Sequence, residues 1–590
     1  MSSQFQPLEI PPGVIAKPTK KMRSSNWAEV NCMRWVEQQM APIGGQAQYN
    51  YAFASRCRRV HSWYGLDQVL HIAYLCEGHL YVDTGGTLTD ISPTPPIVMP
   101  APPATGGFGD GPFSADTFGT PRAISTIDAL DKTPDCFSLA NFGSILYAMT
   151  SPDGRLLMWD PAAGAAGIAA HIATTAAFTT TSPNITMVAN PGSVTPGMSV
   201  SNASGQAVGQ VLTYTGTALV LTANALVAGA SGAVLTFGNV AVTQPANSGR
   251  GPVPEGRLFV VTQERFLMIF GSTADGTAGG GSFRRFAWCD QENPGAWDYS
   301  NVTSQAGFLD IEPSSPIIAA LATRSGVLFW TGKKTYVSQF LGAPYIYNYV
   351  ELAEACTPWS PQSAVNTGGL ALWFSQQGVF SFDGTSVMPV ACSVRPWIDD
   401  DVDLLNVRFQ SFAVHVANFN EFWWFYPQNG QPYNTRAAIY CYKEGWWGQA
   451  RLPRSAGITS SYATHTIMAN GTVAFEHEAG AVYPAGVELP WAETFDLNLN
   501  SGAKLTTIKQ LLPDVEGDIT NLLYSIFYRN SRSTGTPELQ TTPKPVRSDG
   551  YVDLRTTGRD IRLRIALAGP QVLPVTVGQH LVDSVSRGDR

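Results

Sequence analysis

The sequence is short of charged side chains. Only 14% of its 590 residues are charged, whereas soluble domains average about 25%. Asp and Glu (45) outnumber Lys and Arg (37), which gives a net charge of −8. Because no basic excess exists to neutralise phosphates, the composition excludes a classical nucleic-acid-binding protein. Aromatic residues reach 11%, and this excludes a disordered chain, since such chains are poor in aromatics.

Cysteine is also scarce, and it forms no motif. The 8 cysteines are scattered without a CxxC pair, so the pattern favours neither a metal site nor a disulfide framework. We expect them to be buried, reduced and apolar in character, as free cysteine usually is. They are Cys32, Cys57, Cys76, Cys136, Cys289, Cys356, Cys392 and Cys441.

Long apolar segments are missing as well. No run of about 18 apolar residues occurs, so we expect no membrane-spanning segment. The N-terminus, Met1-Ser-Ser-Gln-Phe, has neither the basic nor the apolar region of a signal peptide. We therefore expect synthesis in a reducing cytoplasm.

Turn-forming residues and two-residue periodicity are what the chain does contain. Gly (56) and Pro (41) are abundant, and from about residue 60 onward apolar and polar residues alternate between turns, as in β-hairpins. Hairpin units beginning near 317, 365, 412 and 458 are spaced by about 47 residues, a period typical of propeller blades. The sequence therefore predicts an all-β fold built on a β-propeller. Six blades are favoured over seven, because 458–480 can supply the strand that closes a six-bladed ring.

Changes in composition divide the chain into four parts. Residues 163–247 are rich in Thr, Ala, Ser, Gly and Val, which favours a small β domain over a low-complexity loop. Asn26 is a candidate cap for a short helix within the N-terminal part. The predicted domains are an extended N-terminal arm at 1–50, a β-propeller at 51–162 and 248–490, an inserted β domain at 163–247, and a C-terminal β-sandwich at 491–590.

Acidic residues supply three candidate pairs for glycoside hydrolysis, which needs two converging carboxylates. The pairs are Asp290/Glu292, Glu351/Glu354 and those of the run Asp399-Asp-Asp-Val-Asp403. Each pair is adjacent in sequence, whereas catalytic pairs usually come from different strands, so we favour solvated turns. The acidic run is also a candidate Ca²⁺ site, but it lacks the EF-hand Gly and terminal Glu.

Other motifs also have a structural explanation that we favour. Trp423-Trp424 and Trp446-Trp447 suggest either a sugar-stacking platform or blade core, and core is preferred. Gly276–Gly281 lacks the Lys-Ser/Thr of a phosphate-binding loop. The alternation around Arg562 and Arg564 predicts an exposed strand face that contacts a subunit or partner. We therefore predict no catalytic, cofactor-binding or metal site, and no enzymatic activity.

Short sequence motifs, here called phrases, occur along the chain in a specific order. Together they resemble the tail nozzle or hub proteins of short-tailed bacteriophages, the tail tubular and packaged-DNA-stabilising type. The resemblance covers about 1–160 and 250–590 and leaves 163–247 as a variable insertion. The phrases are Leu8-Glu-Ile-Pro-Pro-Gly-Val14, Met33-Arg-Trp35, Pro42-Ile-Gly-Gly45, Arg58-Arg-Val-His-Ser-Trp63, Gly78-His-Leu-Tyr-Val82, Gly107-Phe-Gly-Asp-Gly-Pro-Phe113, Phe118-Gly-Thr-Pro-Arg122, Asn141-Phe-Gly143, Leu157-Met-Trp-Asp160 and Arg285-Phe-Ala-Trp-Cys-Asp-Gln-Glu-Asn-Pro294.

The resemblance implies a structural virion protein. It implies a homohexameric ring of propellers below the portal and adaptor, which continues the DNA channel, retains packaged DNA and conducts it during ejection. Tail fibres or spikes are further expected partners, no cofactor is expected, and the protein would reside in the virion tail after synthesis in the host bacterial cytoplasm. The net charge of −8 fits a channel wall that offers DNA no phosphate contacts. The alternative is a propeller glycosidase or carbohydrate-binding tail protein that acts on host surface polysaccharide.

Overall fold

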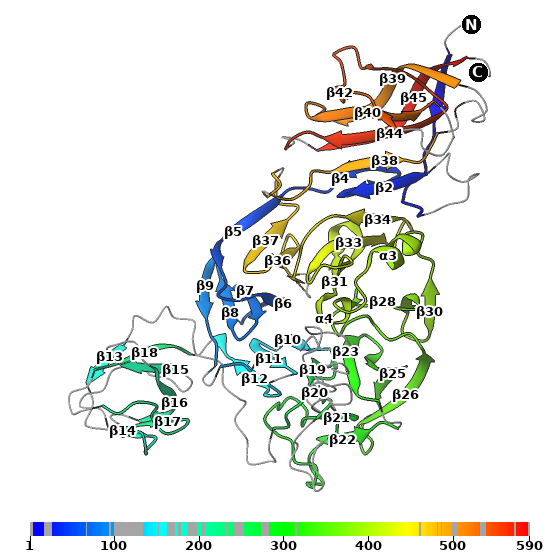
Figure 1. Ribbon diagram of the computed structural model, residues 1–590. Coiled ribbons are helices and arrows are strands. Elements are labelled where there is room, and N and C mark those ends of the chain that lie inside the picture. The colour runs from blue at the N-terminus through cyan, green and yellow to red at the C-terminus, as the bar shows by residue number, and fades with distance from the viewer. Residues whose placement is uncertain are drawn as a thin grey trace, which may run out of the picture. The chain divides into compact units, whose positions relative to one another are not determined.

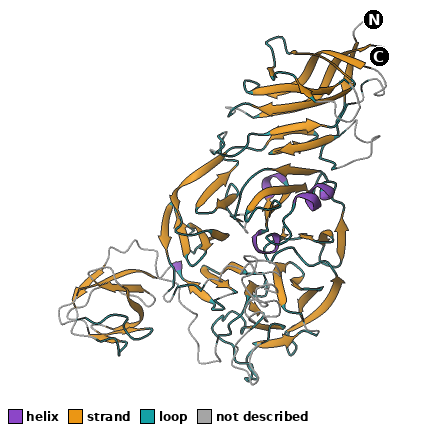
Figure 2. Cartoon of the chain, viewed as in Figure 1, coloured by secondary structure: helices purple, strands orange, loops and turns teal. Residues whose placement is uncertain are grey.

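The structure is a computed structural model, and it consists almost entirely of strands, turns and loops (Figure 1). Helices α3 (Arg395–Asp401) and α4 (Val407–Gln410) are short (Figure 2). The prediction of an all-β propeller fold is confirmed. Among the residues described, no helix is long and apolar enough to cross a bilayer. The described residues are 4–16, 26–66, 68–93, 96–98, 134–151, 153–161, 171–174, 179–186, 198–202, 207–215, 218–229, 234–240, 253–272, 282–312, 315–458, 462–480, 482–484, 486–497, 499, 505–530, 538–570 and 574–587.

The chain divides into two compact units. The first, here called the blade unit, comprises Phe53–Gln362 and Gly384–Ser386. The second, here called the woven unit, comprises Met1–Ala52, Ser363–Asp383 and Val387–Arg590. The woven unit thus combines the predicted N-terminal arm with residues that lie more than 300 positions further along the chain.

The blade unit contains four antiparallel sheets in which consecutive strands pair. Their middle strands, such as β7 and β24, are buried, whereas the last strand of each four-stranded sheet is half-buried to exposed. The first two sheets are β6 (Cys57–Tyr64), β7 (Leu70–Cys76), β8 (Leu80–Thr84) and β9 (Thr87–Asp90), then β10 (Phe137–Phe142), β11 (Ile145–Thr150) and β12 (Leu157–Trp159). The other two are β19 (Leu258–Val261), β20 (Leu267–Phe270), β21 (Arg285–Trp288) and β22 (Gly307–Asp310), then β23 (Ile317–Thr323), β24 (Gly326–Thr331), β25 (Lys334–Phe340) and β26 (Tyr347–Glu354).

The inserted segment folds as one six-stranded sheet in the order β13-β18-β15-β16-β17-β14. Val200, Val208 and Leu221 are buried in it, so its scattered apolar residues form a core of their own. The segment is β structure, as predicted, and its bounds as an inserted domain at 163–247 stay a prediction. Its strands are β13 (His171–Thr174), β14 (Asn184–Thr186), β15 (Met198–Asn202), β16 (Ala207–Thr215), β17 (Ala218–Leu221) and β18 (Val234–Val240).

The woven unit contains three more sheets of the blade type. The last of them is completed by β5 (Gln46–Ala52), which comes from the N-terminal part and pairs with β37. The described residues thus form six such sheets of four strands and one of three, and the preference for six blades is not confirmed. The other strands are β27 (Ala364–Asn366), β28 (Ala371–Ser375), β29 (Gly378–Phe382), β30 (Val387–Val390), β31 (Phe412–Val416), β32 (Glu421–Pro427), β33 (Asn434–Cys441), β34 (Trp447–Ala450), β35 (Ala456–Gly457), β36 (Ile467–Asn470) and β37 (Val473–His477).

Two six-stranded sheets form the C-terminal β-sandwich, and both include strands from the N-terminus. The expected helix at Asn26 is wrong, because the following residues form β2 and pair with β38 (Figure 1); tertiary pairing outweighs a local capping signal. One sheet holds β1 (Gln4–Leu8), β3 (Met33–Val36), β4 (Gln39–Pro42), β39 (Leu505–Gly517), β43 (Val552–Gly558) and β45 (Val575–Arg587). The other holds β2 (Trp27–Asn31), β38 (Trp491–Thr494), β40 (Leu522–Arg529), β41 (Leu539–Gln540), β42 (Lys544–Pro545) and β44 (Asp560–Leu567).

Candidate functional site

The candidate carboxylates of the blade unit are engaged in local contacts. Glu351 and Glu354 both face the ammonium group of Lys334, with N–O distances of 2.7 and 3.1 Å. Glu292 pairs with Arg265 at 3.4 Å. The Asp290 carboxylate accepts the backbone N–H of Gln305, 15 residues further along, at 2.9 Å. Glu292 lies in a turn, as the favoured explanation predicts. Glu351 and Glu354 lie on strand β26, so the expectation of a turn is wrong for them.

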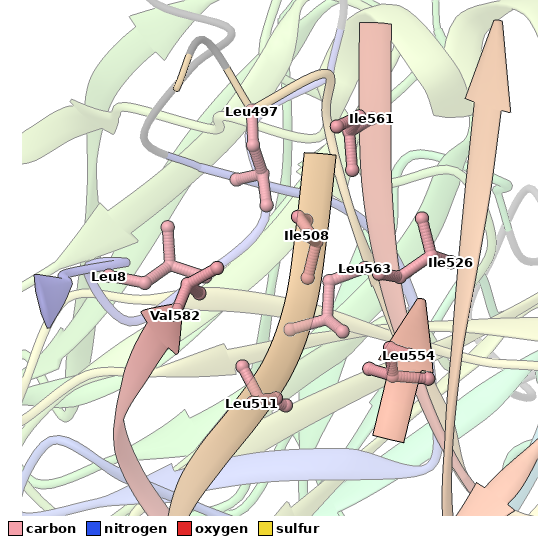
Figure 3. A pocket seen from close by; sticks show the side chains of 9 residues that line it. All are labelled: Leu8, Leu497, Ile508, Leu511, Ile526, Leu554, Ile561, Leu563 and Val582. Carbon is pink, nitrogen blue, oxygen red and sulfur yellow. The ribbon is translucent and has the colours of Figure 1, made fainter. Parts of the chain in front are cut away.

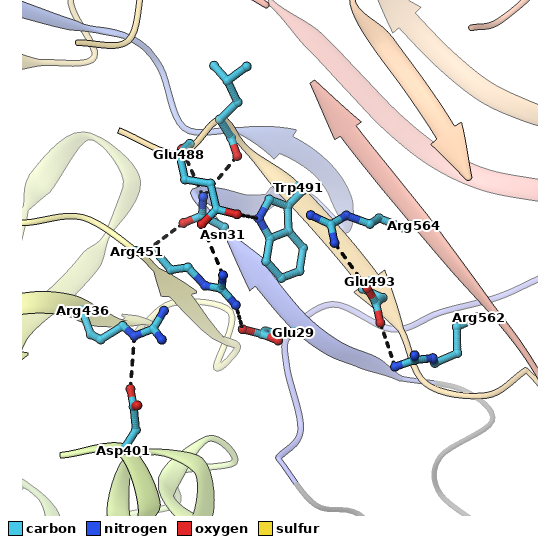
Figure 4. Close-up of polar contacts among 11 residues, drawn as sticks. Glu29, Asn31, Asp401, Arg436, Arg451, Glu488, Trp491, Glu493, Arg562 and Arg564 are labelled. Atoms are coloured by element: carbon cyan, nitrogen blue, oxygen red, sulfur yellow. Dashed lines mark hydrogen bonds and ion pairs between the residues drawn. The ribbon is translucent and has the colours of Figure 1, made fainter. Parts of the chain in front are cut away.

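The acidic run Asp399–Asp403 lies at the ends of two short helices. Asp399 pairs with Arg395 at 3.1 Å, within α3. Asp401 pairs with Arg436 at 3.2 Å (Figure 4). The Asp403 carboxylate accepts backbone N–H groups at the start of α4, at 2.9 and 3.0 Å. In the part of the chain that the structure describes, no three His, Cys, Asp or Glu side chains gather as metal ligands would.

The tryptophan pairs lie in the core. Trp423, Trp424, Trp446 and Trp447 are all buried, and the rings of Trp424 and Trp447 stack at 6.0 Å. The Trp424 indole N–H donates to the Ser363 carbonyl at 3.0 Å. The sugar-platform alternative is therefore wrong, and the preference for core is confirmed. The glycine-rich segment Gly276–Gly281 lies outside the described residues.

A small apolar cavity lies inside the C-terminal β-sandwich (Figure 3). At about 10 Å³ it is at the lower limit for a single water, and its walls offer no polar partner. It is therefore a packing gap, and a ligand site is excluded there. Its apolar lining consists of Leu8, Leu497, Ile508, Leu511, Ile526, Leu554, Ile561, Leu563 and Val582.

The chemically most distinctive feature is a buried charge cluster around Arg34, on β3. Its guanidinium donates two hydrogen bonds to the Glu421 carboxylate, at 2.9 and 3.0 Å, and pairs with Glu478 at 2.5 Å. Glu421 also accepts the Trp423 indole N–H at 2.8 Å, and Glu478 accepts the backbone N–H of Gly44 at 3.1 Å. Although burial opposes it, the two carboxylates raise the pKa of Arg34. One side chain thus joins three separate chain segments.

A second buried cluster surrounds Arg454. Its guanidinium donates to Nε2 of His477 at 3.0 Å and to the side-chain oxygen of Gln46, at the start of β5. Because Nε2 accepts this bond, His477 is neutral, and burial together with the nearby cations Arg454 and Arg34 lowers its pKa well below the usual value. Burial also lowers the pKa of Arg454, to about 9. This cluster holds the strand from the N-terminal part in its sheet.

A third cluster anchors β2 (Figure 4). The Asn31 side chain accepts the backbone N–H of Arg451 at 2.7 Å and donates to the carbonyls of Glu488 and Leu489, both at 3.1 Å. The Arg451 side chain pairs with Glu29 and, at 3.3 Å, with Glu488. Side chains of β2 are thus bound to the backbone of residues 451 and 488 and to the Arg451 side chain.

The arginines of β44 adjoin this cluster. Arg564 lies over the ring of Trp491 at 4.2 Å and pairs with Glu493 at 3.7 Å. Arg562 pairs with Glu493 at 2.8 Å and with Glu538. The alternation that sets the two arginines on one face is confirmed, and their side chains are part-exposed, at 24% and 28%. Acidic side chains of the same unit occupy this face. Contact of this face with a subunit or partner stays a prediction.

Sequence reasoning missed these clusters. The available signal was the arginine between two apolar residues in Met33-Arg-Trp35, since buried Arg usually needs a paired carboxylate. Its partners lie about 390 to 440 residues away. Chemically, the arrangement holds chain segments together and specifies which of them pair.

The comparisons with known proteins give no relative by sequence, because no family model and no curated protein matches the chain. Similar solved structures include a glycoside hydrolase with 8% identity, covering 92% of this chain and 99% of that one, with a TM-score of 0.20. Another is an exo-β-1,3-galactanase from Phanerochaete chrysosporium, with 9% identity, coverages of 91% and 100%, and a TM-score of 0.18. A third is a β-fructofuranosidase from Schwanniomyces occidentalis, with 8% identity, coverages of 92% and 98%, and a TM-score of 0.21.

These structures contradict one expectation. Because they are glycoside hydrolases, the prediction that the chain has no enzymatic activity is withdrawn. Their TM-scores of 0.18 to 0.21 carry no argument about a substrate or a reaction.

Proposed function

We propose that the chain is a structural subunit of a short bacteriophage tail, in which copies form a ring that continues the DNA channel. The observation that carries the proposal is the ordered series of phrases that resembles tail nozzle and hub proteins. Several of these phrases occupy the joins at which the woven unit brings distant segments together. Residues at the contacts between distant chain segments determine which segments pack together. A resemblance at these residues therefore supports a shared fold.

The phrase Leu8–Val14 supports this view. Gly13 has φ +92°, and a Cβ on it would lie 3.0 Å from the Cβ of Trp446, so only glycine fits both the conformation and the space. The next residue, Val14, donates its N–H to the Trp447 carbonyl at 2.8 Å. The phrase therefore specifies how the N-terminal segment docks on β34.

The phrases Met33–Trp35 and Pro42–Gly45 support it in the same way. The first contains Arg34, the centre of the buried charge cluster, and Trp35, whose ring meets that of Trp446 at 5.3 Å. The second contains Gly44, whose N–H donates to Glu478. The phrases Gly107–Phe113 and Phe118–Arg122 lie outside the described residues.

The charge distribution also fits a conduit. The net charge is −8, and the arginines of β44 are paired within their own unit. A ring multiplies this negative charge around its wall, and such a wall lets DNA slide because it gives phosphates no cation to bind.

A carbohydrate-active propeller is the second candidate, named because the similar solved structures are glycoside hydrolases. It requires two carboxylates that converge on a glycosidic bond, about 5 to 10 Å apart. Asp290 and Glu292 are one of the two candidate pairs that the sequence offers in the blade unit. Their local contacts, described above, compete with such a role.

One experiment separates the two candidates. The purified full-length chain is weighed by mass photometry and incubated with bacterial surface polysaccharides, whose products are measured as reducing ends. The nozzle proposal predicts a closed oligomer, six-membered by the family resemblance, whereas the second candidate predicts release of reducing ends. The variants Asp290→Asn and Glu292→Gln serve as controls for any hydrolysis.

The outcomes differ clearly. A monomer that releases reducing ends, and loses this activity in either variant, overturns the nozzle proposal in favour of the glycosidase. A ring that is seen at the tail in micrographs of particles, and whose loss lets packaged DNA escape, supports the nozzle.

A further inference from the structure

Two cysteines of the blade unit lie directly opposite each other. Cys57 on β6 and Cys76 on β7 are partners in the antiparallel ladder, and both side chains are 0% exposed. All eight cysteines of the chain are free. Among the ladders that the structure describes, this pairing alone sets one cysteine opposite another.

The hydrogen bonds identify the kind of pair. The N–H of Glu77 donates to the Arg56 carbonyl at 2.9 Å, so the bond joins the residue after Cys76 to the residue before Cys57. This places the cysteines at a non-hydrogen-bonded position, where opposite Cα atoms lie about 4.5 Å apart and side chains are closest. A disulfide needs Cα atoms about 4.4 to 6.8 Å apart. The ladder therefore holds the two thiols at a bonding position.

Contacts on both strands fix this end of the hairpin. Arg58 pairs with Glu77 at 3.3 Å, and the Ser55 hydroxyl donates to the Glu77 carbonyl at 2.5 Å. The N–H of Cys76 donates to the His79 carbonyl at 2.8 Å, within the turn to β8. A bulge follows Cys57 in β6, and it sets the register that brings the cysteines opposite each other.

We propose that Cys57 and Cys76 are a modification site that forms a cross-strand disulfide when the chain meets a low-molecular-weight disulfide such as oxidised glutathione. One cysteine thiolate attacks the small disulfide, and one glutathione leaves as a thiol. The second cysteine thiolate then attacks the mixed disulfide and releases the other glutathione. Two protein thiols thus lose two protons and two electrons, and one small disulfide becomes two thiols.

Burial determines when this reaction occurs. Burial raises the pKa of the Cys76 thiol, so the reactive thiolate is scarce in the closed sheet. β6 pairs only with β7 within its sheet, so one ladder must open to admit the oxidant. We therefore expect rapid formation during refolding and slow formation in the native protein.

The test is oxidative refolding of the full-length chain. The protein is unfolded in urea, refolded with oxidised and reduced glutathione, and then alkylated under denaturing conditions and digested. We expect two of the eight thiols to be protected and one cross-linked pair of peptides that contain residues 57 and 76. The oxidised protein should melt several degrees above the reduced one, because the bond closes a loop of about 20 residues.

Controls keep the outcome decisive. Cys441→Ser should leave the cross-link unchanged, whereas Cys57→Ser should abolish it and leave Cys76 alkylated. A refolded wild-type chain that keeps all eight thiols, or that links either cysteine to another one, overturns the proposal without recourse to a variant.

Discussion

The two units hold their sheets together in different ways. In the blade unit, neighbouring sheets meet through aromatic rings: the Phe329 ring lies 5.4 Å from that of Phe286 and 5.6 Å from that of Phe270. In the woven unit, the N-terminal segment is joined to later sheets by the buried charges of Arg34 and Arg454. Sheets that follow one another in the chain need no specific contact to select their neighbour. A segment that packs on a sheet hundreds of residues further along does need one.

The physical difference lies in directionality. Apolar contacts are non-directional and roughly proportional to buried area, so they accept neighbours of similar shape. A buried guanidinium requires particular carboxylates, because an unpaired buried charge costs several kcal/mol. In the woven unit, a wrongly docked N-terminal segment would leave buried charges unpaired, and this free-energy cost favours the correct docking.

The largest effect is expected from Arg34→Met. The substitution leaves Glu421 buried without its partner, so we expect a loss of about 3–5 kcal/mol in the free energy of unfolding, measured by urea denaturation. Phe329→Leu is the matched change in the blade unit, and it should cost about 1–2 kcal/mol. The double variant Arg34→Met with Glu421→Leu should regain a large part of the loss, because it removes the orphaned charge. Equal losses in both units would remove the distinction drawn above.

An intermediate effect is expected from acid. Burial lowers the pKa of His61 in the blade unit and of His580 in the woven unit from 6.5 to about 4. Burial, together with the nearby cations Arg454 and Arg34, also lowers the pKa of His477 well below its usual value. Below pH 6.5 the unfolded chain binds protons that the folded chain refuses, so stability falls until the pH reaches the folded pKa. His61 and His580 should each contribute about 2 kcal/mol of loss between pH 6.5 and about pH 5.

The two units should differ in this response. The woven unit holds two of these three histidines, and His477 lies beside two arginines, so its unfolding should move first as the pH falls. His477→Gln should flatten the pH dependence of the woven unit and leave that of the blade unit unchanged. Hydrogen exchange followed from about pH 7 to pH 5 resolves the units, and a uniform response of both would contradict the expectation.

The local parts of the fold were predictable from sequence. The alternation from about residue 60 onward predicts β-hairpins, and the structure has the hairpin of β7 and β8 there. The tryptophan pairs were assigned to core for the same reason. In both cases the pattern and its partner lie within a few tens of residues, so periodicity alone carries the information.

The joins were not predictable in this way. The capping signal of Asn26 predicts a helix where the structure has β2. The sequence near Asn26 does not reveal the strand, because the partner strand β38 lies about 460 residues further along the chain. Arg34 appears as a buried charge only once Glu421 and Glu478 are in place. The Cys57–Cys76 pairing depends on a bulge that shifts the register by one residue. Such features depend on long-range contacts that a single sequence does not display.

The smallest effect is expected from Arg564→Gln, and it tests whether burial or charge itself makes a join decisive. The Arg564 side chain is 28% exposed and lies 3.7 Å from Glu493, so solvent screens the pair and its removal should cost about 1 kcal/mol or less. In about 1 M NaCl this cost should fall further, because the Debye length shrinks to about 3 Å. The loss from Arg34→Met should persist at the same salt concentration, since water does not reach that pair. If salt reduced both losses in parallel, the Arg34 cluster would behave as a surface ion pair. The pairing of the N-terminal segment with later sheets would then have to depend on backbone hydrogen bonds alone.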